Sequence, residues 1–144
     1  MSTPEIQTAM HECRNCAMVM LENAAFIQTE LPNVHMDADF VSQAEQLCDD
    51  LIGTKHDVIH DLFELDENLH GVDIEQAKAY AIATLARLLR WMQEDMMKMH
   101  DLVVALEAAS KREPKSGSAF MLVLESATNI LNAFNRVKAA VELI

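Results

Sequence analysis

The sequence is poor in glycine and proline, with three of each among its 144 residues. Both residues interrupt regular structure, so their scarcity permits long uninterrupted helices. Aromatic residues make up only 5% of the chain, and the valines and isoleucines that favour sheets are outnumbered by alanine, leucine, methionine, glutamate and glutamine, which favour helices. The composition therefore predicts an all-α protein.

Basic residues are also few. Eleven lysines and arginines stand against 23 aspartates and glutamates, which gives a net charge of −12 at pH 7. Twelve of the acids lie between residues 37 and 75, where Lys55 is the single basic residue. A field of this sign repels nucleic acid and anionic membranes and attracts cationic surfaces. We therefore expect a protein partner with a basic surface, and no binding to nucleic acid or membranes.

Long apolar runs are missing as well, since none approaches the roughly 20 residues that a membrane-spanning helix needs. The N-terminal segment MSTPEIQTAM lacks the basic and apolar regions of a signal peptide. Three cysteines cannot all pair with one another, which favours a reducing compartment and thiols rather than disulfides. The sequence predicts a cytoplasmic protein whose residues 1–144 form a single helical-bundle domain.

Sequence motifs of the common catalytic sites are not found. The chain has no glycine-rich phosphate loop, no Walker motif and no Ser-His-Asp order. Lys55 occupies a core position of a predicted helix, where a lysine can act as a nucleophile, but no cluster of acid, base and oxyanion donors accompanies it. We expect that the protein is not an enzyme and has no cofactor.

Four segments repeat apolar residues at steps of three and four, the spacing of an amphipathic helix. The first helix is predicted over about 4 to 30, between the capping box Ser2-Thr3-Pro4-Glu5 and the break at Leu31-Pro32-Asn33. The second runs from about 38 to 68 through Gly53, the third from about 74 to 111, and the fourth from Ser118 to the C-terminus. Four such helices with short loops predict an antiparallel up-down-up-down four-helix bundle.

The apolar seams of these helices give the predicted core, which includes Met20, Cys48, Ile82, Leu85 and Phe134. Cys13 and Cys16 have CxxC spacing, but they lie well inside the first helix with no strand before them, unlike a thioredoxin motif. Ordinary core packing explains such residues. Because sulfur ligands in a bundle core also suit Cu(I), the alternative function is a soft-metal-binding or small-ligand-binding bundle. Its ligands would be Cys13, Cys16, Cys48 and Met20.

Among these thiols, Cys16 lies closest to the flank of its seam, so it should react faster than Cys13 and Cys48. Histidines 56 and 60 stand four residues apart, a spacing that can bind one metal ion from a single helix face. Their phase places them on the outer face of the second helix, among acids. A solvated polar face, an exposed Zn²⁺ or Ni²⁺ site and a pH-sensitive partner surface all fit this position.

Two surfaces are candidates for partner binding. The outer face of the second helix carries Asp49, Asp50, Asp57, Glu64 and Glu67. The third helix has apolar residues beyond its seam, with Tyr80, Trp91 and Met97 giving the mixture typical of protein interfaces. The sequence thus predicts a small acidic interaction or regulatory module, resembling chaperones, antitoxins or inhibitors in composition. It would engage a basic partner through the second helix and form a homodimer through the third.

Overall fold

The chain is almost entirely helical. The computed structural model describes residues 3–34, 36–68, 74–112 and 118–142, with the side chains of most of them. Its long helices are α1 (Thr3–Glu30), α2 (Ala38–Asn68), α3 (Ile74–Arg112) and α4 (Ser118–Glu142), and a 3-10 turn, η1 (Leu31–Asn33), follows α1. No strand occurs within the described ranges. The all-α prediction is confirmed.

The ends of the helices follow local signals in the sequence. Pro32 lies in η1, where α1 has ended, because proline removes a backbone donor and blocks a continuing helix. Asp37 precedes α2, and its carboxylate accepts the backbone N–H of Asp39 at 3.4 Å, as an N-cap residue does. Gly53 does not interrupt α2 and lies on its exposed side. The predicted bounds therefore agree with the structure to within about two residues.

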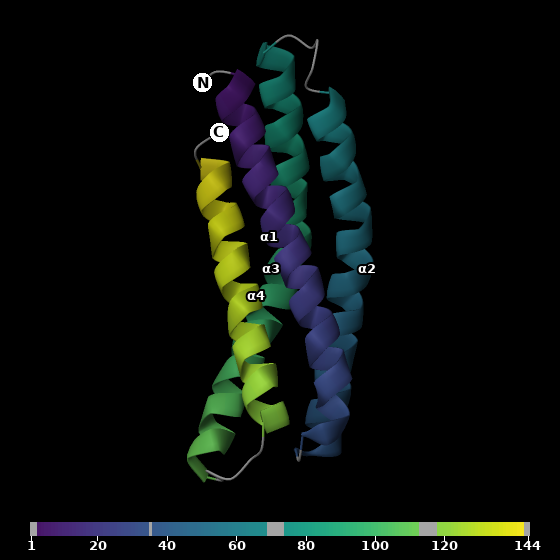
Figure 1. Ribbon diagram of the computed structural model, residues 1–144, viewed down its shortest axis with the longest axis vertical. Coiled ribbons are helices and arrows are strands. Elements are labelled where there is room, and N and C mark those ends of the chain that lie inside the picture. The colour runs from purple at the N-terminus through teal and green to yellow at the C-terminus, as the bar shows by residue number, and fades with distance from the viewer. Residues whose placement is uncertain (1–2, 35, 69–73, 113–117, 143–144) are drawn as a thin grey trace.

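The four helices lie alongside one another, with the start of α1 and the end of α4 at the same end of the molecule (Figure 1). Helix α1 packs against α4 and α2, and α3 packs against the same two helices. Across the described parts of the chain, α2 and α4 do not meet. One apolar core therefore fills the space between the helices. No helix in these ranges has the length and hydropathy that crossing a membrane requires.

Nearly all described seam residues are buried in this core. The largest fully buried side chains come from three helices and η1, and they are Met10, Met20, Ile27, Leu31, Leu51, Leu85 and Met92. Ile82 is an exception, since it was expected in the core and is 42% exposed. Helix α3 has 39 residues and α4 has 25, so α3 extends about 20 Å further at 1.5 Å per residue. Its first turns project beyond the end of α4 (Figure 1), which leaves Ile82 without that neighbour.

Helices α1 and α4 form the most extensive pair. Arg136 forms an ion pair with Glu12 at 2.8 Å, and Asn129 donates a hydrogen bond to Asn23 at 3.2 Å. On the same side of α4 as Asn129 and Arg136, the small residues Ser126, Ala133 and Ala140 recur every seven positions and are buried. Small side chains let the two helices approach closely, so this pair packs tightly.

Candidate functional site

A groove of about 540 Å³ lies between α2 and α3. We call it the α2–α3 groove, and ten residues line it: Phe40, Gln43, Ala44, Gln46, Leu47, Asp50, Lys98, Asp101, Leu102 and Ala105. In Figure 1 the start of α2 and the end of α3 lie at the same end of the molecule, but on opposite sides of the view. The helices diverge there, and the small side chains Ala44 and Ala105 leave the space between them unfilled.

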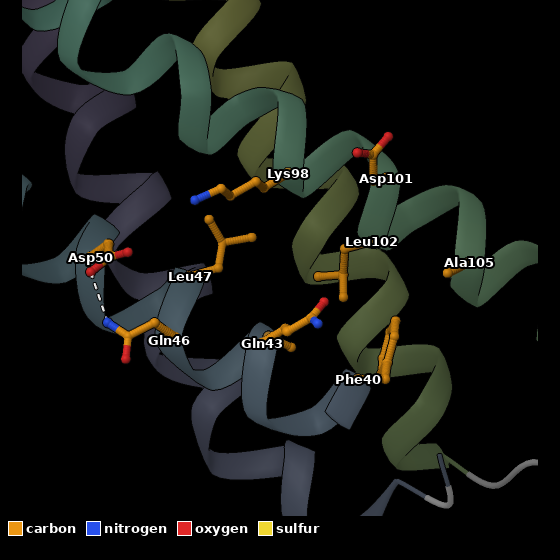
Figure 2. Close-up of a pocket in the computed structure, with 10 residues that line it drawn as sticks. Phe40, Gln43, Gln46, Leu47, Asp50, Lys98, Asp101, Leu102 and Ala105 are labelled. Carbon is orange, nitrogen blue, oxygen red and sulfur yellow. Dashed lines mark hydrogen bonds between the residues drawn. The ribbon is translucent and has the colours of Figure 1, made fainter. Parts of the chain in front are cut away.

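The groove differs in character along its length (Figure 2). Phe40, Leu102 and Ala105 gather at one end, where they offer apolar surface. Asp50 lies at the other end, where it accepts a hydrogen bond from Gln46 at 3.0 Å. The Lys98 side chain extends from α3 toward the same end, and Asp101 turns its carboxylate away from the centre. The result is an apolar floor with a charged end and polar rims.

Asp95 adds a buried carboxyl group beside the charged end. It lies one helical turn before Lys98 and is only 9% exposed. Burial raises its pKa, the negative charge of Asp50 on α2 raises it further, Lys98 lowers it, and Glu94 raises it slightly. No hydrogen bond or ion pair involves Asp95 among the described residues. Asp95 was not predicted as a site residue, although its position directly before the core residue Met96 indicates an acid close to the core.

The acidic residues predicted on the outer face of α2 divide into two sets. Asp49 and Asp50 are both exposed, as expected, and only Asp50 lines the groove. Asp49 lies on the other side, where it accepts a hydrogen bond from Gln28 of α1. The side chains of Asp57, Glu64 and Glu67 fall outside the described residues. Of the two histidines, His60 is exposed, whereas the side chains of His56 and of Lys55 fall outside the description.

The residues predicted to form an apolar face on α3 do not share one stripe. Tyr80 is 56% exposed and Met97 is 66% exposed. They are 17 positions apart, which rotates their directions by about 100° around the helix. Val104, seven positions after Met97, is also exposed and points within about 20° of it. The side chain of Trp91 lies outside the described residues. The exposed apolar surface of α3 thus centres on Met97 and Val104.

The cysteines lie in the core, and all three are thiols. Cys13 is fully buried, and burial, followed by the nearby Cys16 and Glu12, raises the pKa of its thiol from 9.0 to about 12. Cys16 is also buried, with only 2% of it exposed, and its faster reaction relative to Cys13 and Cys48 stays a prediction. Helix α4 covers this flank of α1, and the Cys16 thiol donates to Glu12 at 3.7 Å. Burial and Glu12 raise the pKa of Cys16, whereas Arg136 lowers it.

The register of α1 and α2 also differs from the simplest expectation, which places Cys48 opposite residue 20. The hydrogen bond between Gln28 and Asp49 shows that Cys48 lies nearer the end of α1. Cys48 is therefore further from Cys13 than expected. Met20 is buried with the cysteines, but no group of three or more His, Cys, Asp or Glu residues in the described chain has an arrangement that could hold a metal ion.

Comparisons with protein families, with curated proteins and with solved structures found no match to this chain. The features of this chain that bear on its function are the residues of the α2–α3 groove and the distribution of charge.

Proposed function

We propose that this chain is a non-enzymatic interaction module that engages a basic protein partner through the acidic α2 helix. The observation that supports this function is the α2–α3 groove, whose charged end is formed by an α2 acid, Asp50, beside the buried Asp95. Four acids and one base, Lys98, lie at this end and along the neighbouring rim of α3, the acids being Asp50, Glu94, Asp95 and Asp101. This local charge has the same sign as the net charge of −12. A cationic surface is therefore favoured both during approach and on contact.

We also propose how the helices are connected in space, how two copies of the chain associate and in which compartment the protein acts. The four helices would form one antiparallel up-down-up-down bundle domain, in which α1 and α4 hold the core while α2 and α3 present the groove. Exposed Met97 and Val104 on α3 support a homodimer interface on a side of α3 about 100° around the helix from the groove. The protein would act in a reducing compartment, the cytoplasm, because its cysteines are thiols. No observation favours the soft-metal alternative over core packing of the cysteines.

The test compares two double variants with the same change in net charge. Asp49→Asn/Asp50→Asn removes two charges from α2, and Glu125→Gln/Glu142→Gln removes two from exposed positions of α4. Each protein is immobilised, and the basic partner that wild-type protein retains from a lysate of its native host is measured by titration at rising salt. The α2 variant should bind at least about tenfold more weakly and show a shallower salt dependence, whereas the α4 variant should match wild type.

Equal weakening by the two variants would show that net charge alone attracts the partner, and the assignment to α2 would be wrong. If the α2 variant bound with unchanged affinity and salt dependence, the acidic helix would serve only solubility. Retention of no basic protein at low salt would contradict the proposed function as a whole.

A further inference from the structure

The α2–α3 groove is open to solvent along both sides. Its five polar rim residues, Gln43, Gln46, Asp50, Lys98 and Asp101, are all exposed. A volume of about 540 Å³ accommodates several side chains, while the open rims leave room for the main chain that carries them. An amphipathic helix binds such grooves by placing the residues of one face, at i, i+3 or i+4 and i+7, into the depression.

The two ends of the groove specify different side chains of such a helix. Phe40, Leu102 and Ala105 offer apolar contacts at one end, and Leu102 and Leu47 are already largely buried in the floor. The charged end carries Asp50 on α2, with Lys98 extending toward it from α3 (Figure 2). An occupant that complements both ends is apolar over most of its contact face and carries a cation at one end of that face.

Asp95 gives a second reason, separate from the exposed acids, to expect that the charge of the occupant is positive. Only 9% of the residue is exposed, and the negative charge of Asp50, on the other side of the gap between α2 and α3, raises its pKa together with burial, whereas Lys98 lowers it. No described residue gives it a hydrogen bond. Burial and the charge of Asp50 therefore disfavour the charged form of Asp95, and a cation bound beside Asp50 would reduce that cost. The nearby Lys98 offsets only part of this cost, because its ion pair is with Glu94, at 3.7 Å.

We propose that the α2–α3 groove binds an amphipathic helix of the basic partner, with one arginine or lysine of that helix placed beside Asp50, where the negative charge of Asp95 also favours a cation. Its apolar side chains would pack against Phe40, Leu102 and Ala105. This inference rests on the proposed function and assigns to it a binding mode, a partner chemistry, a contact residue, Asp50, and a supporting negative charge, Asp95. Lys98 then competes with the incoming cation, so it sets an upper limit on affinity.

The probe is a fluorescein-labelled amphipathic peptide of about 18 residues, with leucines along one face and an arginine at one end of that face. A control peptide has the same composition in an order that forms no apolar face. Binding to the full-length protein is followed by fluorescence anisotropy. Wild type should bind the amphipathic peptide at least about tenfold more tightly than the control peptide, because only the amphipathic one fits the floor of the groove.

Four variants separate the parts of the mechanism. Asp95→Asn should weaken peptide binding by at least about tenfold, although it relieves a buried charge in the free protein. Ala105→Trp, which fills the apolar end without changing charge, should weaken it similarly. Lys98→Gln should strengthen binding, because it removes the competing cation. Glu125→Gln on α4 makes the same charge change as Asp95→Asn at an exposed, distant position and should have no effect beyond about twofold.

The sign of the Lys98→Gln effect tests the charge assignment, since weaker binding of the arginine peptide would mean that Lys98 does not compete with a cation in the groove and would overturn that assignment. Equal affinity for the two peptides, or equal effects of Asp95→Asn and Glu125→Gln, would overturn the groove assignment. In that case the proposed function survives if Asp49→Asn/Asp50→Asn still weakens retention of the basic partner. Circular dichroism confirms that each variant keeps its helix content, so loss of binding is not read from an unfolded protein.

Discussion

The Cys13 thiol should be almost inert in the folded protein, and its rate of alkylation can be worked out from the structure. The nucleophile is the thiolate, so reactivity follows the fraction of thiol that is ionised. With a pKa raised to about 12, this fraction at pH 8 is about 1 in 10,000, compared with about 1 in 11 for an unfolded thiol of pKa 9.0. Ionisation alone therefore slows the reaction by about 1,000-fold. Complete burial of Cys13 slows it further.

The measurement uses the Cys16→Ala/Cys48→Ala variant, in which Cys13 is the remaining cysteine. Its reaction with iodoacetamide at pH 8 is followed by mass spectrometry in buffer and in concentrated urea. The control adds Cys13→Ser and Met97→Cys to this background, which places one thiol at an exposed site where the two rates should be similar. A Cys13 rate within about tenfold of the unfolded rate would refute the burial of this thiol, and with it the packing of α1.

The same pKa shift makes stability depend on pH. Below pH 9.0 the thiol is protonated in both the folded and the unfolded chain, so it contributes no pH dependence. Above pH 9.0 the unfolded chain loses the proton first, and stability falls as the pH rises toward about 12. At pH 10 the loss due to Cys13 is at most about 1.4 kcal/mol. Cys13→Ala should show a correspondingly smaller loss between pH 8 and pH 10 in urea denaturation.

Three further predictions address other parts of the molecule. Asp95→Asn should raise the free energy of unfolding at pH 7, because burial and Asp50 disfavour the carboxylate in the folded protein. This gain should vanish below pH 3.8, where Asp95 is protonated in both the folded and the unfolded wild-type chain. Lower stability than wild type at pH 7 in urea denaturation would contradict it. Gly53→Ala should stabilise the protein by about 0.5–1 kcal/mol, because the position is helical, exposed and has nothing within 4 Å of an added Cβ; thermal unfolding would show the opposite shift if the position is strained. Met97→Glu should convert a dimer to a monomer with unchanged helix content, as sedimentation equilibrium can measure, and a wild type that is monomeric at high micromolar concentration would exclude the interface.

Much of the fold could be predicted because each helix carries its own signals. Pro32 ends α1, Asp37 begins α2, and the steps of three and four in the apolar seams mark which side of each helix is buried. These signals are local, so they do not depend on how the helices meet. Gly53 could have ended α2, but the apolar seam keeps the same phase before and after it, and the helix continues through this residue. The periodicity of burial contributes more free energy than the helix propensity of one residue.

What the sequence did not predict depends on contacts between helices. Ile82 follows the seam of α3, but its exposure is decided by the length of α4. Cys16 lies on the flank of its own seam, yet the close approach of α4 buries it. The α2–α3 groove exists because two helices diverge where Ala44 and Ala105 are small, and no pattern within either helix records that separation. Likewise, the proximity of Asp95 to Asp50 arises only when α2 and α3 are brought together.

The two sides of the molecule suit different tasks. Between α1 and α4, small buried side chains, an ion pair and an inter-helix hydrogen bond hold the helices at close range. Between α2 and α3, the space is incompletely filled, and a buried carboxyl group faces a second acid. In the proposed complex, the helix of the partner would fill this space, and its cation would offset the charges of Asp50 and Asp95. Such binding would add contacts between α2 and α3 without changing the packing of α1 against α4. Asp95→Asn should therefore have opposite effects on two quantities: it removes a disfavoured charge, which raises the free energy of unfolding, and it removes an attraction for the cation, which weakens peptide binding.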